Sequence, residues 1–447
     1  MARIHMDFNK KTGKVKPMHA VGQPPMLGGF LSLDLSPIHY LEDAHIPYAR
    51  LHDVGGDFGG NRFVDIPNLF RNFDADENDP ASYDFAFTDY LLKGMAEYHV
   101  APIFRLGVTI ENQAHIKAYR IYPPKDYGKW ARICEHVIRH YNEGWADGFY
   151  YDIKYWEIWN EPDGGPAGEN QMWIGTNEQF YELYHVAATH LKSCFGNAIK
   201  VGGYAACSPR GIFYEPEKYG VDLSVIEERK APTAIGTHRL EFLFGFFDYI
   251  KEHKSPLDFF SWHSYGTVEK TVEMAKFFNR VLTQYGYGDV ETMLNEWNGP
   301  HEQIQHGTSY ASAQAAAMMC AMHECPVDML CFYDAKMGGG RYGGFFNGLT
   351  HQPYCTYYSF VAFGKLYAMG TAVECVSDTK KLYALAATNG KKQGALITNT
   401  TDATQEVTTP LEGGTVFLID GDHHLTATDW SSAAFTLAPD QTVYIEK

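Results

Sequence analysis

The chain of 447 residues is too long for one small domain and fits a barrel of roughly 300 residues plus an accessory domain. Hydrophobic residues make up 45% of it, which supplies a large core and argues against an intrinsically disordered chain. The formal net charge of -17 repels phosphate backbones, so we predict no nucleic-acid partner. No apolar run approaches the ~20 residues that cross a bilayer, and we predict no membrane partner.

The eight cysteines are spread through the sequence, and none forms a CxxC pair. Most lie in apolar surroundings, so we predict buried free thiols rather than disulfides. Residues 1–17 contain basic residues but no apolar segment of the kind found in secretory signals. Both observations favour a cytoplasmic protein, with secretion left open if a signal has been trimmed.

From residue 18 to residue 368, short apolar runs alternate with longer amphipathic stretches. The runs, each predicted as a strand, are Met18–Gly22, Tyr48–Asp53, Ala101–Gly107, Lys154–Asn160, Lys200–Tyr204, Phe259–Tyr265, Thr292–Trp297 and Met329–Asp334. The predicted helices include Phe85–Tyr98, Tyr127–Tyr141, Asn177–Phe195, Val268–Tyr285 and Ser309–His323. Repeated alternation predicts parallel strands, and eight units favour a closed (β/α)8 TIM barrel over an open doubly wound sheet. No G-x-G-x-x-G follows the first strand, which argues against a dinucleotide fold.

After about residue 368 the pattern changes to short strands separated by turn residues. The predicted strands there are Lys381–Ala387, Gln393–Thr398, Thr415–Ile419 and Thr442–Ile445. This pattern predicts a small C-terminal antiparallel β-sandwich domain over residues 369–447. Residues 1–17 form a separate N-terminal segment that is a candidate additional strand of this domain, and residues 18–368 form the predicted barrel.

Polar residues gather at the carboxyl ends of five predicted barrel strands, where the active sites of such barrels lie. The strand ends read Arg50-Leu51-His52-Asp53, Trp159-Asn160-Glu161-Pro162-Asp163, Trp262-His263-Ser264-Tyr265, Leu294-Asn295-Glu296-Trp297-Asn298 and Phe332-Tyr333-Asp334. Chance seldom places polar groups at the same end of so many strands. Trp297, Tyr333 and Asp334 are therefore candidate substrate-binding residues.

Glu161 and Glu296 stand on the fourth and seventh predicted strands, on opposite sides of a closed barrel. Hydrolysis of a glycosidic bond needs such a pair, one carboxyl to protonate the leaving oxygen and one to attack or to activate water. Repulsion between the two charges predicts that one member stays protonated at neutral pH. Glu157, with the same strand parity as Glu161, is expected ~13 Å deeper as an ion-paired or hydrogen-bonded core residue.

These residues resemble glycoside hydrolase family 39, the family of β-xylosidases and α-L-iduronidases among the retaining (β/α)8 hydrolases. The matching pieces are Ala49–Asp53, Tyr155–Asp163, Ser261–Tyr265 and Leu294–Asn298, in an order and spacing that cover about residues 18–368. The resemblance implies Glu161 as acid/base and Glu296 as nucleophile. It also implies that Arg50, His52, Asn160, His263 and Tyr265 support or contact the sugar in the −1 subsite.

The leading hypothesis is a retaining glycosidase that releases terminal sugars by double displacement, with β-xylosidase-like specificity. The loop after strand eight, from residue 333 to residue 349, and the glycine-rich stretch 55–60 differ from the β-xylosidase pattern. Because both should line the pocket, β-galactosidase, arabinofuranosidase or glucosidase specificity stays open. The expected partner is an oligosaccharide or small glycoside, and a homo-oligomer is left open.

Two other classes of function were weighed. His52, Asp53, His263 and Glu296 have ligand types that could be read as a metal cluster, as in barrel sugar isomerases, but no HExxH motif or closely spaced histidine pair supports this alternative. We therefore predict no metal and no cofactor. A carbohydrate-binding protein without turnover is the second alternative, and the two intact glutamates argue against it.

Overall fold

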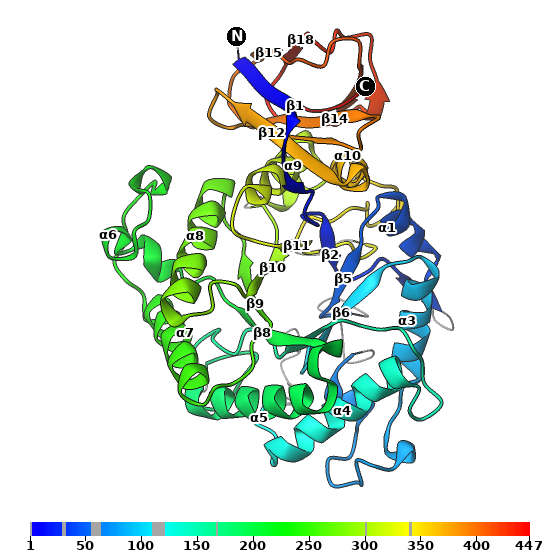
Figure 1. Cartoon of the computed structure of the whole chain (residues 1–447), viewed down its shortest axis with the longest axis vertical. Helices are drawn as coiled ribbons and strands as arrows, with labels where there is room; N and C mark the ends of the chain where they lie inside the picture. The colour runs from blue at the N-terminus through cyan, green and yellow to red at the C-terminus, as the bar shows by residue number, and fades with distance from the viewer. Residues whose placement is uncertain are drawn as a thin grey trace. The chain divides into compact units, whose positions relative to one another are not determined.

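The computed structural model describes residues 2–28, 33–54, 64–109, 121–166, 169–299, 302–338 and 342–447. Eight strands form a closed barrel in the order β10-β11-β2-β5-β6-β7-β8-β9 (Figure 1). In chain order they are β2 (Ala20–Gly22), β5 (Tyr48–Leu51), β6 (Ala101–Leu106), β7 (Tyr155–Ile158), β8 (Lys200–Ala206), β9 (Phe259–Ser264), β10 (Glu291–Trp297) and β11 (Met329–Phe332). All eight coincide with predicted strands. The pairings of β11 with β2 and of the successive strands from β5 to β9 are parallel, so the predicted TIM barrel is confirmed.

The helices that connect these strands include two long ones that sequence patterns did not predict. The helices are α1 (His39–Asp43), α2 (Ile66–Leu69), α3 (Ala86–Glu97), α4 (Tyr127–Glu143), α5 (Asn177–Phe195), α6 (Pro216–Tyr219), α7 (Ala234–Glu252), α8 (Val268–Tyr285), α9 (Ser309–His323) and α10 (Cys355–Met369). Figure 1 shows α3, α4, α5 and α7 outside strands β6–β9. Of the helices without a predicted counterpart, α1, α2 and α6 have only five, four and four residues. The two long ones are α7 and α10, whose unbroken apolar runs 242–247 and 360–364 hide the helical period.

The β domain is one nine-stranded sheet, ordered β17-β16-β19-β14-β13-β12-β1-β15-β18. Its strands are β1 (Ala2–Lys14), β12 (Thr371–Ser377), β13 (Leu382–Thr388), β14 (Gln393–Asn399), β15 (Gln405–Thr408), β16 (Thr415–Ile419), β17 (His424–Ala427), β18 (Ala434–Leu437) and β19 (Thr442–Glu446). Its neighbours pair antiparallel except β1 with β15, which run parallel. Its two ends share one core that includes Ile4, Ile397, Val407 and Leu437, as in a sandwich. The predicted antiparallel β domain is therefore confirmed.

The described chain divides into two compact units that do not follow the chain order. One consists of Met1–Pro47, Tyr265–Val272 and Trp297–Lys447, and the other of Tyr48–Ser264 and Glu273–Glu296. Both candidate catalytic glutamates lie in the second unit. A two-stranded ribbon, β3 (Leu27–Gly28) with β4 (Leu33–Asp34), belongs to the first.

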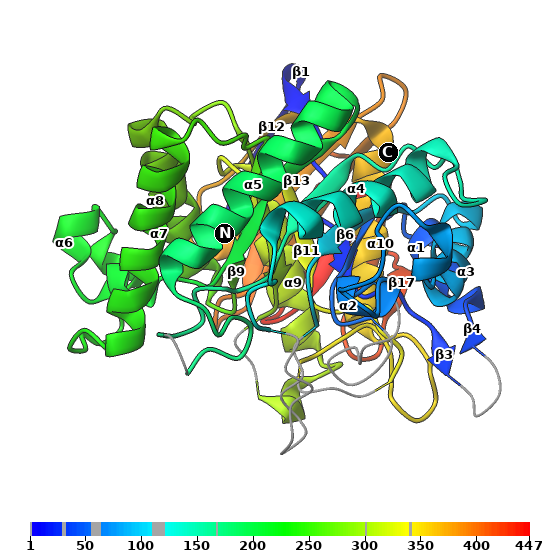
Figure 2. The same cartoon turned by 90° about the horizontal axis from the view of Figure 1, so that it is seen from below.

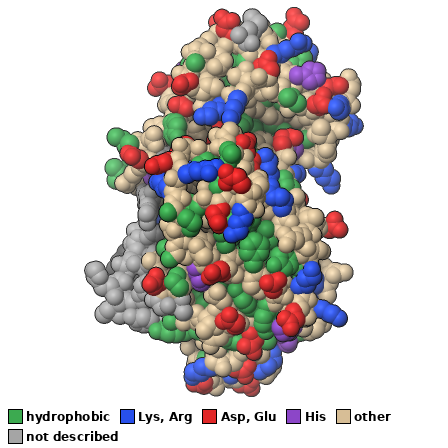
Figure 3. Space-filling view, turned by 90° about the vertical axis from the view of Figure 1, so that its left-hand side faces the viewer, with side chains coloured by type: hydrophobic (Ala, Val, Ile, Leu, Met, Phe, Trp, Pro, Cys, Tyr) green, Lys and Arg blue, Asp and Glu red, His purple; other side chains and the backbone are tan. Residues whose placement is uncertain are grey.

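All eight cysteines are free and six of them are buried, which confirms the predicted thiols. Within the described ranges, no helix is long and apolar enough to cross a membrane. On the face that Figure 3 shows, acidic and basic side chains are interspersed among the residues drawn in colour. The net charge of -17 is therefore not gathered into a single acidic patch on that face.

Candidate active site

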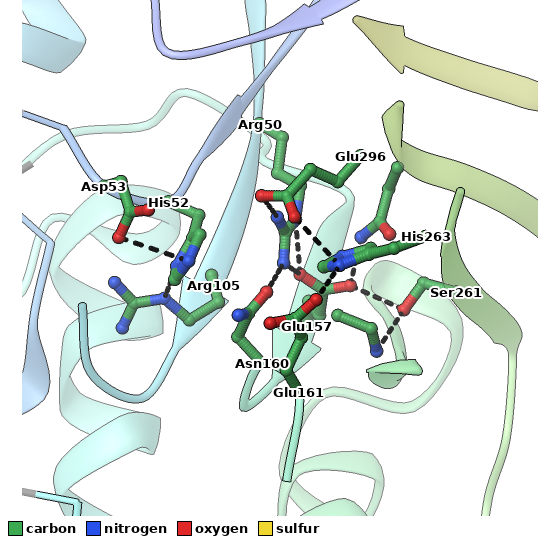
Figure 4. Close-up of polar contacts among 12 residues, drawn as sticks. Arg50, His52, Asp53, Arg105, Glu157, Asn160, Glu161, Ser261, His263 and Glu296 are labelled. Atoms are coloured by element: carbon green, nitrogen blue, oxygen red, sulfur yellow. Dashed lines mark hydrogen bonds and ion pairs between the residues drawn. The ribbon is translucent and has the colours of Figure 1, made fainter. Parts of the chain in front are cut away.

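The structure brings Glu161 and Glu296 together around one histidine. Nδ1 of His263, on β9, lies 2.8 Å from Oε1 of Glu161 and 2.9 Å from Oε2 of Glu296 (Figure 4). One oxygen of each carboxylate and the ring nitrogen all lie within 4.8 Å of one another. Glu161 follows β7 and Glu296 lies near the end of β10, the fourth and seventh barrel strands in chain order. The two acidic groups and the imidazole therefore form one compact charged centre.

The loop that carries Glu161 leaves β7 through two left-handed residues. Trp159 has φ +70° and Glu161 has φ +46°, conformations that cost free energy in a residue with a side chain. Backbone hydrogen bonds hold the loop, from Trp159 N to Leu106 O at 2.8 Å and from Glu161 N to Ala205 O at 3.1 Å. The indole nitrogen of Trp159 also donates to the carbonyl of Met172 at 2.8 Å. The strained turn aims the Glu161 carboxylate at His263.

Arg50, on β5, connects the barrel core to the charged centre. Its Nε donates to Oε2 of Glu157 at 2.7 Å, and another guanidinium nitrogen donates to Oδ1 of Asn160 at 2.6 Å. A third nitrogen lies 3.7 Å from Oε1 of Glu296. Arg50 and Glu157 are both buried, so the guanidinium is held firmly beside the Glu296 carboxylate.

Glu157 is a buried, multiply hydrogen-bonded residue, as predicted. Besides Arg50, it accepts hydrogen bonds from Ser261 Oγ at 2.6 Å and from the Asn295 side-chain amide. The estimate of ~13 Å between Glu157 and Glu161 rested on an extended chain, whereas the residues after β7 include two with left-handed φ. Glu157 and Asn160 share the Arg50 guanidinium.

The protonation states of His263 and Glu161 differ from the prediction that one carboxyl stays protonated. Burial alone would lower the pKa of His263, but the Glu296 and Glu161 carboxylates outweigh it and raise that pKa to about 9. Burial would likewise raise the pKa of Glu161, but the hydrogen bond with His263, the charge of His263 and the charge of Arg239 together outweigh burial and lower the pKa. The expectation that repulsion keeps one carboxyl protonated is therefore wrong for Glu161. The reason is that an imidazolium stands between the two carboxylates.

His52 belongs to a second buried network beside the charged centre (Figure 4). Its Nδ1 accepts from Arg105 Nε at 3.2 Å, and its Nε2 lies 3.2 Å from Oδ1 of Asp53. Arg105 is held in turn by Asp65 at 2.6 Å. Burial, followed by the Arg50 and Arg105 charges, keeps the pKa of His52 well below its usual value, so the ring is neutral. Sequence reasoning missed Arg105, although a charge inside the apolar strand β6 is a usable signal.

Arg239, on α7, is a second residue that the sequence did not predict. The positive charge of Arg239 lowers the pKa of Glu161, and only burial and His263 have a larger effect on that pKa. It also opposes the effect of burial on Asp163, which still raises the pKa of that carboxyl to about 7. Asp163 accepts from the backbone N–H of Cys207 at 3.0 Å. No sequence signal marked Arg239, because α7 itself was not predicted.

Trp297 closes β10 and is described within the other compact unit. Its ring packs against Phe332 with centroids 5.1 Å apart, and it stacks on Phe360 at 6.4 Å. The side chain is buried. In its own unit, Trp297 is thus part of an aromatic core.

The last three predicted residues, Tyr265, Tyr333 and Asp334, also belong to that unit. Tyr333 and Tyr265 have ring centroids 6.5 Å apart, and Tyr342 stacks on Tyr265 at 4.7 Å. Asp334 is buried and accepts from the backbone N–H of Lys336 at 3.2 Å. Tyr265, Tyr333 and Tyr342 therefore form an aromatic cluster next to a buried carboxylate. The glycine-rich stretch 55–60 lies outside the described residues.

The metal cluster that the sequence offered as an alternative, His52, Asp53, His263 and Glu296, is not the group that the structure brings together. Among the described residues, His263 and Glu296 have metal-ligand spacing together with Glu161. His52 and Asp53 are not part of this group. His52 instead accepts a hydrogen bond at its Nδ1 from Arg105.

Comparison with known families agrees with the strand-end motifs. Residues 60–295, more than half of the chain, match the model of the family described as glycosyl hydrolases family 39. The chain belongs to glycosyl hydrolase family 39. This confirms the resemblance noted from the sequence.

Individual relatives of this family 39 chain show the same likeness. A β-xylosidase from Caldicellulosiruptor saccharolyticus is 28% identical over 184 residues, which cover 38% of this chain and 34% of that enzyme. The matched part thus corresponds to about a third of that relative's length. A glucosidase structure from Croceicoccus marinus has a TM-score of 0.76 at 21% identity and covers 100% of this chain and 98% of its own. A GH39 β-xylosidase structure from Caulobacter crescentus has a TM-score of 0.68 at 14% identity, with 99% of both chains covered. At these identities, the structural likeness shows the fold alone.

Removal of the Glu157 carboxylate should deprive the buried Arg50 guanidinium of its nearest counter-charge. We expect Glu157→Ala to lower the free energy of unfolding by about 3–5 kcal/mol, measured by urea denaturation. Glu217→Ala is the matched control, because it breaks an ion pair with Arg229 whose side chains are 61% and 57% exposed. That change should cost much less than Glu157→Ala, because solvent screens an exposed ion pair. Equal losses in the two variants would contradict the central place given to Glu157.

The raised pKa of His263 should make stability depend on pH. Its folded value of about 9 exceeds the ordinary 6.5, so its stabilising effect is complete below pH 6.5 and is lost as pH rises through about 9. We expect the difference in free energy of unfolding between the wild type and His263→Gln to shrink across this window. Urea denaturation on either side of it measures the change, and a constant difference would refute the charge assignment.

Proposed function

We propose that this family 39 chain is a retaining glycoside hydrolase with Glu296 as nucleophile and Glu161 as acid/base. The observation that carries the proposal is the pair of carboxylate oxygens within 4.8 Å of each other. Retaining enzymes hold their carboxyl groups about 5–5.5 Å apart, whereas inverting enzymes leave about 6.5–9.5 Å for a water molecule. The short separation supports direct attack on the sugar by Glu296.

In the first step, Glu296 attacks the anomeric carbon and the leaving oxygen takes a proton from Glu161. The His263–Glu161 pair holds that proton. A protonated histidine beside an ionised glutamate carries the same single proton as a neutral histidine beside a protonated glutamate. Transfer along the 2.8 Å contact from Nδ1 to Oε1 converts the first form into the second. The lowered pKa of Glu161 in the free site is therefore compatible with its role as an acid.

In the second step, ionised Glu161 takes a proton from water, and the resulting hydroxide attacks the anomeric carbon. The bond to Glu296 breaks, and its carboxylate returns to the side of Arg50, 3.7 Å away. Arg50 also holds the Asn160 oxygen, so the N–H groups of that amide are set to donate to a sugar hydroxyl. The sugar leaves with the same anomeric configuration that it had in the substrate.

For the substrate, we propose a glycoside with a terminal β-xylosyl group. Support comes from the matched relative, which is itself a β-xylosidase. A glucoside is the second candidate, because glucosidase specificity was left open by the sequence and a glucosidase has the same fold, with a TM-score of 0.76. The two sugars differ by one hydroxymethyl group, so a closed end of the pocket would decide between them. Galactosidase and arabinofuranosidase specificities remain to be measured in the same assay.

The two glutamates should respond differently to substitution. We expect Glu161→Gln to lower kcat about 10²–10⁴-fold on aryl glycosides with poor leaving groups. Its loss should be smaller on activated substrates, where azide should restore turnover. Glu296→Gln should lose on the order of 10⁴-fold or more on both kinds of substrate. Glu169→Gln, an exposed change in the loop after Glu161, serves as the control. Near-normal kcat in either active-site variant on a poor leaving group would refute the roles.

A panel of p-nitrophenyl glycosides tests the sugar. A pocket shaped for xylose should reject the additional hydroxymethyl group of glucose by about 10–200-fold in kcat/KM. We therefore expect the β-xyloside to exceed the β-glucoside by such a factor, and the reverse order would favour the glucosidase reading. NMR of the first-formed sugar should show the β anomer, and the α anomer would exclude double displacement.

A further inference from the structure

A second group of metal-ligating side chains lies away from the charged centre, where α4 and α5 pack against each other (Figure 2). Glu135 comes from α4, and His190 and Cys194 come from α5. The spacing of four residues places the histidine and the cysteine on one face of their helix. That face meets the glutamate of the neighbouring helix, so the three ligand types converge from two elements.

The distances suit a tetrahedral cation. Zn–N bonds of about 2.0–2.1 Å and Zn–S bonds of about 2.3 Å place the two ligand atoms about 3.6 Å apart at a tetrahedral angle. In the structure, His190 Nε2 and Cys194 Sγ are 3.7 Å apart. Glu135 Oε2 lies 2.6 Å from the same nitrogen and would have to withdraw by less than about 1 Å. The nitrogen–sulfur pair thus already has the separation that zinc requires.

Arg139 holds the glutamate in position from the other side. Its Nε donates to Glu135 Oε1 at 2.8 Å, which leaves Oε2 directed at the histidine. The guanidinium is itself fixed over the ring of Phe195, 5.1 Å from the centroid. A hydrogen bond to the distal oxygen of a carboxylate ligand is the usual outer-shell support of a metal site.

We propose that Glu135, His190 and Cys194 bind a thiophilic divalent cation, with Zn²⁺ as the best fit. The side chains of His190 and Glu135 are 30% and 14% exposed, so an ion can enter and a water molecule can complete the tetrahedron. On binding, the Cys194 thiol releases its proton to solvent and its sulfur bonds to the cation. The proposal does not depend on the proposed hydrolase activity.

Such an ion would link the helices on either side of β7. Helix α4 precedes β7 in the chain, and α5 follows it. This strand carries Glu157 and leads into the loop of Glu161. The cation is therefore expected to stabilise the barrel around that loop without taking part in the chemistry.

The test uses Co²⁺ as a spectroscopic probe in the full chain. Glu296→Gln serves as the parent, because it removes one ligand of the other candidate group, Glu161, His263 and Glu296. In this parent we expect a thiolate-to-cobalt charge-transfer band and its loss in Cys194→Ser. Cys375→Ser, which removes the other partly exposed thiol, is the matched control and should keep the band.

Calorimetry with Zn²⁺ on the same variants provides a second readout. His190→Gln keeps the thiol and should weaken Zn²⁺ binding by at least about tenfold. Zn²⁺ should also displace Co²⁺ and raise the Tm of the parent but not that of Cys194→Ser. No charge-transfer band in the parent, or a band that persists in Cys194→Ser, would overturn the proposal and leave the three residues as an ordinary ion-paired cluster.

Discussion

The buried ion pair between Arg50 and Glu157 is the interaction on which the rest of the site depends. Its side chains are 1% and 0% exposed, and removing two charges from water is expensive unless both are well compensated. Ser261 and Asn295 supply that compensation from β9 and β10, so the carboxylate gathers donors from three other strands. The same guanidinium then faces Glu296. The need to compensate a buried charge in the core thus fixes the positions of the residues around Glu296.

Above this pair, charges alternate in a small volume. His263 separates the Glu161 and Glu296 carboxylates, and Arg50 stands beside the second of them. Inside a protein such neighbouring charges interact strongly, so protonation of one group shifts the pKa values of the others. The site is best regarded as one acid–base unit with a shared proton. Removal of negative charge from Glu296 during a reaction cycle would weaken the hold of His263 on its proton.

Much of this architecture was readable from the sequence because polar residues interrupt apolar strands at their ends. That signal located Glu161 and Glu296, and alternation with amphipathic helices predicted the barrel. Helices α7 and α10 were not predicted, because their apolar runs show no helical period. Strict alternation also fails at the end of β10, since Asn295 and Glu296 are consecutive and both join the polar network. The reversed pKa shift of Glu161 required the position of His263, which no local pattern encodes.

The pairing of β1 has a consequence for how the polypeptide reaches its final form. This strand lies between β12 and β15, whose residues are made more than three hundred positions later. A growing chain must therefore keep β1 unpaired while the intervening barrel emerges from the ribosome. The closure entropy of so long a loop rises only slowly with length, so waiting costs little thermodynamically. The risk is kinetic aggregation, because an unpaired β1 with alternating apolar residues can pair with another molecule before β12 and β15 have been synthesised.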